Sequence, residues 1–185
     1  MMLGNLDGYW IEEQRLYCGS HPSRIFDPRI RPALRDGISE ILRCGFSCLV
    51  DLTTRLEHEV YGNMGYFYPD YDEQMLTSIA FGIGMKAELL RSPILDGSVP
   101  PLEEMKVLLD GIDIRLDLGF RIYLHCGSAI GRAPLVGGCY LKRHRKTYEE
   151  ILRVFPSPHR TAHGHVKESI PDTEEQKAYI RDWWN

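Results

Sequence analysis

Short apolar runs alternate along this chain with longer segments in which apolar residues recur at helical spacing. This alternation favours an α/β fold, in which helices cover both faces of a central sheet. We therefore predict a single domain over 1–185, with its core in about 9–184. Strands are expected in 10–18 (two short pieces), 46–51, 85–94 and 120–124.

Helical periodicity predicts the segments that would cover this sheet. A glycine at 45 ends the first predicted helix, and the prolines at 100–101 open the third, where the first turn tolerates proline. Thr173 and Gln176 have the spacing of a capping box, in which two side chains satisfy backbone N–H groups at a helix start. Helices are expected at 30–44, 70–81, 100–119, 134–144 and 148–154, with a last one from about Thr173 to Trp183 and Trp184.

Charge and composition narrow the classes of function. The formal net charge of −4 gives no support to general nucleic-acid binding. No apolar run approaches the roughly 18 residues of a membrane span, and the first residues lack the basic segment of a secretory signal. Five cysteines without dense spacing fit a reducing compartment. We therefore expect a cytoplasmic protein, monomeric or weakly homo-oligomeric, with no nucleic-acid or membrane partner.

One stretch in the second half of the chain carries recognisable chemistry. The strand expected at 120–124 runs into His125 and Cys126, and Arg132 follows after five small or apolar residues. Such a loop can turn its backbone N–H groups inward, where they and the positive end of the next helix bind a phosphate dianion. Glycines allow the unusual backbone angles, and arginine adds a planar fork for two phosphate oxygens. The predicted phosphate-binding loop comprises Gly127, Ser128, Ala129, Ile130, Gly131 and Arg132.

The same surroundings favour the anionic form of Cys126. A thiol at a helix N-terminus near a cation can have its pKa lowered to roughly 3.5–7.5. Cys126 would then attack phosphorus in line and form a cysteinyl-phosphate, which water hydrolyses. His125 is expected to fix the loop by hydrogen bonds rather than to transfer protons. The alternative interpretation of Cys126 is a buried structural cysteine.

The leaving group needs a proton, and Asp96 is the candidate donor. It lies in the loop 92–100, which is bracketed by prolines and hinged at Gly97. Such a loop can close over a substrate, so Asp96 would protonate the ester oxygen and later act as base towards water. Asp70 and Asp72 are rival candidates, and an aspartate before glycine can also simply form a turn.

These motifs resemble those of the cysteine-based protein phosphatases of the tyrosine and dual-specificity type. The family signature His-Cys-x5-Arg is matched by His125, Cys126 and Arg132, and the general-acid loop is similar to 93–100, with the acid on Asp96. The resemblance, to small bacterial members in particular, covers about 10–184 and includes 16–22, 50–53 with Glu57, and 170–176. It implies a twisted, mixed, largely parallel sheet of four to five strands with helices on both faces. It also implies hydrolysis of phosphate monoesters without metal or organic cofactor. The substrate would be a phosphoprotein (phosphotyrosine or dual-specificity) or a small phosphomonoester.

The chain departs from the family pattern at three places. Ala133 replaces the usual Ser or Thr, whose hydroxyl stabilises the departing thiolate when the intermediate breaks down. Its absence predicts slow dephosphorylation of the enzyme, or another donor such as Ser128. Ala129 stands where glycine is usual, and its Cβ could strain a tight turn. Asp172 replaces a water-positioning glutamine and is not given that role. A catalytically weak phospho-binding module therefore stays open as an alternative, with arsenate reduction or sulfur transfer as a third.

Other cysteines, histidines and aromatics allow further interpretations. Two spaced pairs have side chains that zinc prefers, Cys44 with Cys48 and His163 with His165. The two cysteines fit core positions better, so no metal site is predicted. Cys18 could form a disulfide with Cys126 under oxidation. The aromatic segment 66–71 could line the active site or belong to the core.

Overall fold

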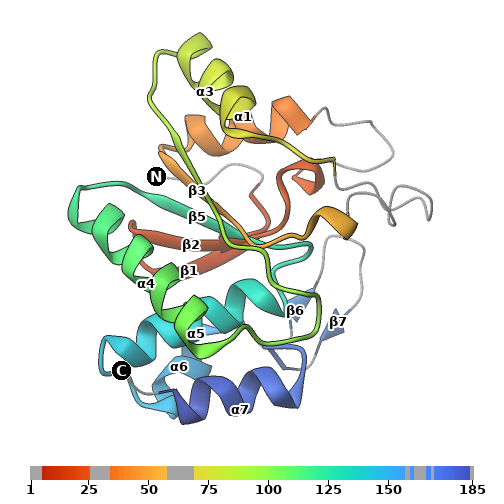
Figure 1. Ribbon diagram of the computed structural model, residues 1–185, viewed down its shortest axis with the longest axis vertical. Helices are drawn as coiled ribbons and strands as arrows, with labels where there is room; N and C mark the ends of the chain where they lie inside the picture. The colour runs from red at the N-terminus through yellow and green to blue at the C-terminus, as the bar shows by residue number, and fades with distance from the viewer. Residues whose placement is uncertain are drawn as a thin grey trace.

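A five-stranded mixed sheet forms the centre of the computed structural model, which describes residues 6–25, 34–57, 69–156, 159–160, 166–167 and 169–183. The strand order is β1-β2-β5-β3-β4, and only the β1–β2 pair is antiparallel (Figure 1). The mixed, largely parallel sheet expected from the sequence is therefore confirmed. Its strands are β1 (Gly8–Glu12), β2 (Leu16–Gly19), β3 (Cys48–Asp51), β4 (Glu88–Arg91) and β5 (Ile122–His125).

Helices cover both faces of this sheet. One face carries α1 (Leu34–Arg43) and α3 (Glu73–Gly82), and the short 3-10 helix η1 (Pro22–Arg24) packs against α1 (Figure 1). The other face carries four helices: α4 (Leu102–Asp117), α5 (Arg132–Arg143), α6 (Tyr148–Val154) and α7 (Glu174–Asp182). A two-stranded antiparallel hairpin, β6 (His159–Arg160) with β7 (Val166–Lys167), was not predicted. Strands of two residues are too short to give a sequence period.

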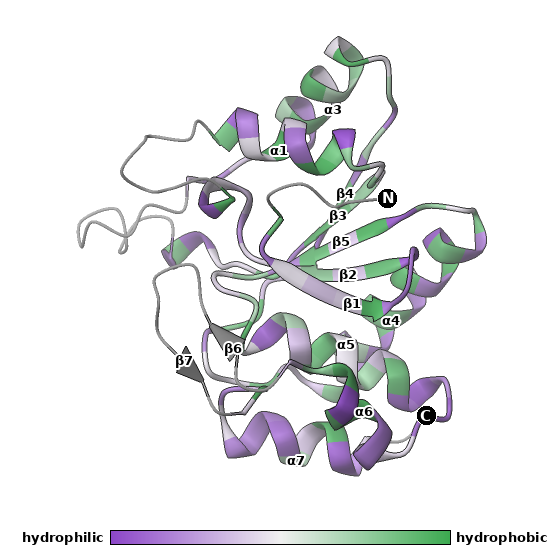
Figure 2. Ribbon diagram, turned by 180° about the vertical axis from the view of Figure 1, so that it is seen from behind, coloured by the Kyte–Doolittle hydropathy of each residue, from purple (hydrophilic) through white to green (hydrophobic). Residues whose placement is uncertain are grey.

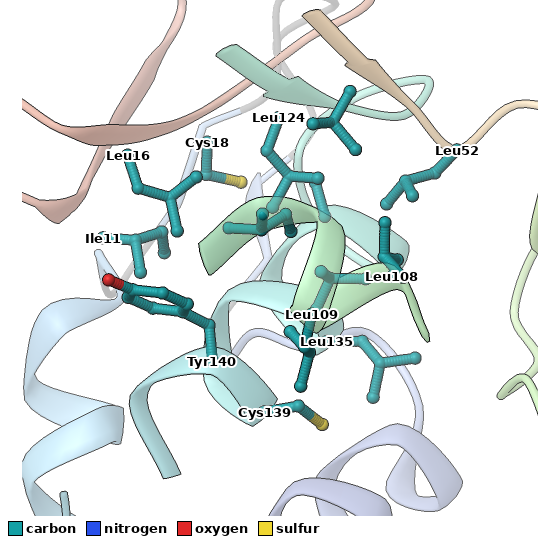
Figure 3. Packing of buried hydrophobic residues seen from close by; sticks show 14 of the residues in the cluster. Ile11, Leu16, Cys18, Leu52, Leu108, Leu109, Leu124, Leu135, Cys139 and Tyr140 are labelled. Atoms are coloured by element: carbon teal, nitrogen blue, oxygen red, sulfur yellow. The ribbon is translucent and has the colours of Figure 1, made fainter. Parts of the chain in front are cut away.

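Successive side chains of each strand point to opposite faces of the sheet, and this divides the buried core into two clusters. In β5, Ile122 and Leu124 face the α4–α7 side, whereas Tyr123 faces α1 and α3. All four residues of β5 are buried, as expected for a central parallel strand covered on both faces. Figure 2 shows the strands coloured largely hydrophobic. Figure 3 shows the cluster between the strands and α5, with Ile11, Leu16, Cys18, Leu52, Leu108, Leu109, Leu124, Leu135, Cys139 and Tyr140.

Several element ends differ from the predictions for physical reasons. The helix expected at 70–81 begins at Glu73, because the Asp72 carboxylate caps it by accepting from Met75 N at 2.7 Å. Helix α5 begins at Arg132, two residues before the predicted start at Pro134, since the whole first turn can hold proline. Residues 30–33 and Trp184, predicted to be helical, lie outside the described residues. No helix in the described part of the chain is long and apolar enough to cross a membrane.

Candidate active site

The predicted phosphate loop lies at the carboxyl end of the central strand. β5 pairs in parallel with β2 and β3, and the chain leaves it at His125 and enters α5 at Arg132. In open α/β sheets this edge, beyond the carboxyl ends of the strands, is where ligands bind. The loop residues 126–131 are therefore held between a rigid strand and a rigid helix.

The first peptide of this loop turns its carbonyl outward and its N–H group inward. The Gly127 carbonyl accepts hydrogen bonds from His21 N at 3.2 Å and Arg24 Nη1 at 3.3 Å, so it points towards η1. In a trans peptide the next N–H, that of Ser128, points the opposite way. Within the described part of the chain, no acceptor takes the N–H groups of 127–131. A row of unused donors at a helix N-terminus is suited to an anion.

Ala129 takes the strained conformation that the sequence led us to expect. Its φ is +59°, in the left-handed region, and its methyl group is buried in the core. For a residue with a Cβ this conformation costs roughly 1–2 kcal/mol. The loop therefore keeps its curvature at this position without a glycine, because the surrounding packing holds it.

Arg132 is buried and its guanidinium is held on one edge. Nη1 donates to Glu57 Oε2 and Nη2 to Glu57 Oε1, both at 2.7 Å, and Nη1 also lies 3.1 Å from the Ile94 carbonyl. Glu57 therefore occupies the edge formed by Nη1 and Nη2, and the contact of Arg132 with phosphate stays a prediction. Nε is buried and has no acceptor within the described residues. The edge left for an anion is the one that carries Nε.

The charges around Arg132 stabilise one another. Burial alone would lower the pKa of Arg132, but the Cys126 sulfur, Glu57 and Asp96 together raise it above its ordinary value. Burial alone would raise the pKa of Glu57, and Arg132 and Thr54 instead bring it below its ordinary value. Thr54 donates to Glu57 Oε2 from both its N–H (2.7 Å) and its hydroxyl (2.8 Å). The guanidinium therefore stays charged inside the fold.

Asp96 lies beside this arginine, as the position of its loop predicted. Its Oδ1 is 3.1 Å from Arg132 Nη2, and its side chain is 57% exposed. The loop turns at Gly97, whose φ is +75°, and Ser98 N donates to the Leu95 carbonyl at 3.1 Å. The rivals are engaged elsewhere: Asp70 accepts from Arg91 at 2.7 Å, and Asp72 caps α3.

His125 is held from behind the loop. Its Nε2 is 2.6 Å from the Tyr71 hydroxyl, and its own carbonyl accepts from Leu52 N at 3.1 Å. Burial lowers the pKa of His125, with the Asp51 carboxylate opposing the shift, so the neutral ring is favoured. The side chain is thus tied to Tyr71, and its role in fixing the loop stays a prediction. Of the aromatic segment 66–71 only 69–71 is described, and there Tyr71 is buried in the core.

Sequence reasoning missed three contributors to this arrangement. Glu57 was noted only as part of a resemblance, and Gln176 only as a helix cap within a resembling segment. Tyr71 was noted only within an aromatic segment that could line the site or belong to the core. Each lies far along the chain from the residue it contacts: Glu57 from Arg132, Tyr71 from His125, and Gln176 from Gly131, where an added Cβ would lie 3.4 Å from its Oε1. For Glu57 and Gln176, the signal that could have pointed to the site is an acid or amide in a segment expected to be buried, because a buried polar group needs a partner.

The remaining cysteines behave as core residues. All five cysteines lie in the described part of the chain and none forms a disulfide. Burial raises the pKa of Cys48 to about 12 and that of Cys18 well above its ordinary value. No cluster of metal-ligating side chains occurs among the described residues, and His163 and His165 lie outside them. A disulfide between Cys18 and Cys126 stays a hypothesis.

Comparison with known proteins gives the fold its context. No protein-family model and no curated protein matches the sequence. Three solved structures resemble it over nearly their full lengths. The active form of Tk-PTP has a TM-score of 0.63 and 20% identity, covering 95% of each chain. Kinase associated phosphatase, with serine for its catalytic cysteine, has a TM-score of 0.67 and 17% identity over 96% of this chain and 92% of that one.

The third is the human tyrosine phosphatase-like serine/threonine/tyrosine-interacting protein, with a TM-score of 0.62 and 12% identity over 95% of this chain and 94% of that one. The chain has the fold of the protein-tyrosine and dual-specificity phosphatases. A shared fold does not by itself establish an activity, so function has to be argued from the site.

Proposed function

We propose that this protein hydrolyses phosphate monoesters through a cysteinyl-phosphate intermediate on Cys126. One observation carries the proposal. The N–H groups of 127–131 and the buried Nε of Arg132 have no acceptor within the described residues, and they belong to the loop that begins at Cys126. Buried donors without partners cost about 1–3 kcal/mol each. A tetrahedral oxyanion would satisfy them together and lie against the sulfur.

The proposed reaction has two steps. The Cys126 thiolate attacks phosphorus, the P–O bond to the leaving group breaks, and Asp96 gives its proton to the departing oxygen. Water then attacks the cysteinyl-phosphate while Asp96 takes a proton from it, and the S–P bond breaks to release inorganic phosphate and the thiolate. The loop N–H groups and Arg132 stabilise the charge on the non-bridging oxygens in both transition states.

Two exposed leucines favour substrates with an apolar group next to the phosphate. Leu95 lies between Ile94 and Asp96, which both contact Arg132, and Leu56 precedes Glu57, which binds the same guanidinium. Their side chains are 62% and 59% exposed, respectively. Burying a leucine against a ligand gains up to roughly 1.5–3 kcal/mol. We therefore propose an aryl phosphate such as phosphotyrosine as the preferred class, within phosphoprotein or small-molecule substrates.

This preference has a direct test. Leu95→Ser and Leu56→Ser should each lower kcat/KM for an aryl phosphate about tenfold, and that for a polar alkyl phosphate by less than twofold. Leu118→Ser, at a 70% exposed leucine just after α4, is the matched control and should change neither. Equal losses for both substrates would refute the apolar preference.

The alternative is a phospho-binding module with little turnover. Ala133 is buried and has no hydroxyl to assist breakdown of the intermediate, which leaves Ser128 as the one hydroxyl between Cys126 and Ala133. Steady-state release of phosphate from an aryl phosphate decides between the two. Turnover by the wild type that is lost in Cys126→Ser supports the enzyme. Vanadate binding without turnover supports the module, and full activity in Cys126→Ser excludes the mechanism.

A further inference from the structure

A buried glutamine joins the two loops that carry the proposed chemistry. Gln176, in the first turn of α7, is 0% exposed. Its Nε2 donates to the Ser98 carbonyl at 3.1 Å, two residues after Asp96. Its side-chain amide also lies against the end of the phosphate loop, because a Cβ on Gly131 would be 3.4 Å from Oε1 and 3.5 Å from Nε2. The Gln176 side chain therefore contacts both loops.

Thr173 makes the matching contact one residue nearer to Asp96. Its hydroxyl donates to the Gly97 carbonyl at 3.3 Å and accepts from Gln176 N at 3.2 Å. Gln176 Oε1 in turn accepts from Thr173 N at 3.4 Å, which completes a capping box. The two side chains that cap α7 thus also hold two consecutive carbonyls of the general-acid loop.

The other restraints on this loop lie within it or at its ends. Upstream it is fixed by Ile94 N, which donates to the Leu52 carbonyl at 3.0 Å. Across the tip, the N–H and hydroxyl of Ser98 donate to the Leu95 carbonyl at 3.1 and 2.8 Å, and Val99 packs against the core. The side chains of Leu95 and Asp96 are 62% and 57% exposed, and Gly97 has a φ of +75°. The contacts to Thr173 and Gln176 join the downstream side of this turn to α7.

We infer that Thr173 and Gln176 are positioning residues that hold Asp96 beside Arg132 for proton transfer. We call this pair the latch. The inference rests on the proposed function, because it assigns the latch to the step in which Asp96 protonates the leaving group. A general acid contributes only when it is held in reach of the departing oxygen, so a freely pivoting tip would lose part of its effect.

Two substitutions distinguish the hydrogen bonds of the latch to the Asp96 loop from the hydrogen bonds that cap α7. Gln176→Glu keeps an acceptor for Thr173 N, and glutamate is a favoured residue at this capping-box position, but its carboxylate cannot donate to Ser98. Thr173→Asp keeps an N-cap acceptor for Gln176 N but has no hydroxyl to donate to Gly97. Because Gln176 is fully buried, the partly exposed Thr173 position provides the variant that better tolerates a new charge.

The chain offers a matched control in its other capping box. At the start of α6, Thr147 N donates to Glu150 Oε2 at 2.8 Å and Glu150 N to Thr147 Oγ1 at 3.2 Å. Both hydrogen bonds stay within the helix end. Glu150→Ala therefore weakens a cap of the same kind without altering the loop of Asp96.

The experiment compares aryl phosphates with poor and good leaving groups. Gln176→Glu and Thr173→Asp should lower kcat/KM, which reports formation of the cysteinyl-phosphate, about tenfold for phenyl phosphate, the loss expected for a hydrogen bond or two. For dinitrophenyl phosphate, whose leaving group needs no proton, kcat/KM should change by less than twofold. Glu150→Ala should change neither. In an Asp96→Ala background both latch variants should have no further effect.

Two outcomes overturn the latch. Equal losses of kcat/KM for both leaving groups, or a further loss in the Asp96→Ala background, would mean that Thr173 and Gln176 support only the fold. If the wild type hydrolyses no phosphate ester, the proposed function has failed. Amide hydrogen exchange in 94–98 then tests, independently of activity, whether Thr173 and Gln176 restrain the loop. Exchange about tenfold faster in both variants than in the wild type supports it, and unchanged exchange rejects it.

Discussion

At the scale of single residues, the pair of Glu57 and Arg132 sets both stability and anion binding. Glu57→Gln keeps the volume but replaces one accepting oxygen with a donor that faces Nη1 or Nη2 of Arg132. Because hydrogen bonds to charged groups contribute roughly 1.5–3 kcal/mol, we expect kcat/KM for an aryl phosphate to fall ten- to hundredfold. Glu88→Gln, which alters a surface pair with Arg115 at 3.1 Å, is the control and should change little.

The same pair has a predictable dependence on pH. Pairing brings the pKa of Glu57 below its ordinary value of 4.5, so its contribution to stability is fully present above that pH. It is lost as the pH falls through the lowered pKa. The difference in free energy of unfolding between wild type and Glu57→Gln, measured by urea titration, should therefore shrink below about pH 4.5. A difference that grows on acidification would contradict the assignment.

Under the proposed function, Ala133 is the residue at which we expect turnover to be slowed. It is buried beside Arg132 at the start of α5, where a serine hydroxyl could donate to the departing sulfur. If breakdown of the cysteinyl-phosphate limits the wild type, Ala133→Ser should raise kcat about tenfold and reduce the pre-steady-state burst. Stopped-flow detection of the aryl alcohol measures both. A burst that is identical in the two proteins would reject this account of Ala133.

At the scale of elements, the contact between α5 and α7 determines where the latch lies relative to the phosphate loop. A Cβ on Gly138 of α5 would lie 2.5 Å from Ile180 Cδ1 of α7, and Ile180 is fully buried. Gly138→Ala should therefore force the helices apart and destabilise the protein by about 1–3 kcal/mol, as overpacking does. Gly82→Ala in α3 is the control, because nothing lies within 4 Å of an added Cβ there. It should stabilise by up to about 1 kcal/mol.

Thermal and urea unfolding measure both glycine variants. A second measurement on Gly138→Ala is the comparison of phenyl and dinitrophenyl phosphate, because a displacement of α7 also displaces Thr173 and Gln176. We expect a larger loss of kcat/KM for phenyl phosphate than for dinitrophenyl phosphate. A Gly138→Ala protein as stable as the wild type would show that the helices approach each other less closely than described.

At the scale of the whole molecule, features formed by contiguous residues could be predicted from the sequence, whereas contacts between residues far apart in the chain could not. The segment from His125 to Arg132 could be identified from the sequence because strand, loop and helix are contiguous there. The α/β class could be predicted because short apolar runs and helical periods alternate, whereas the mixed sheet was implied by the family resemblance. The partners of these residues could not be predicted, since Glu57, Tyr71 and Gln176 reach the site only through the order of the strands and the packing of α7. The pairing of Glu57 with Nη1 and Nη2 of Arg132 was not predicted for the same reason.

Anion binding should stabilise the entire fold, because an anion that binds the folded loop 127–132 but not the unfolded chain shifts the unfolding equilibrium towards the native state. A ligand that binds only the native state adds about 2.7 kcal/mol to the free energy of unfolding at a hundred times its Kd. Phosphate or vanadate should therefore raise the melting temperature of wild type and of Cys126→Ser, since the latter keeps the loop N–H groups and Arg132. Arg132→Ala, which loses the buried Nε, should lose the effect. Sodium chloride at equal ionic strength controls for general screening, and an equal shift with chloride would count against a specific anion site.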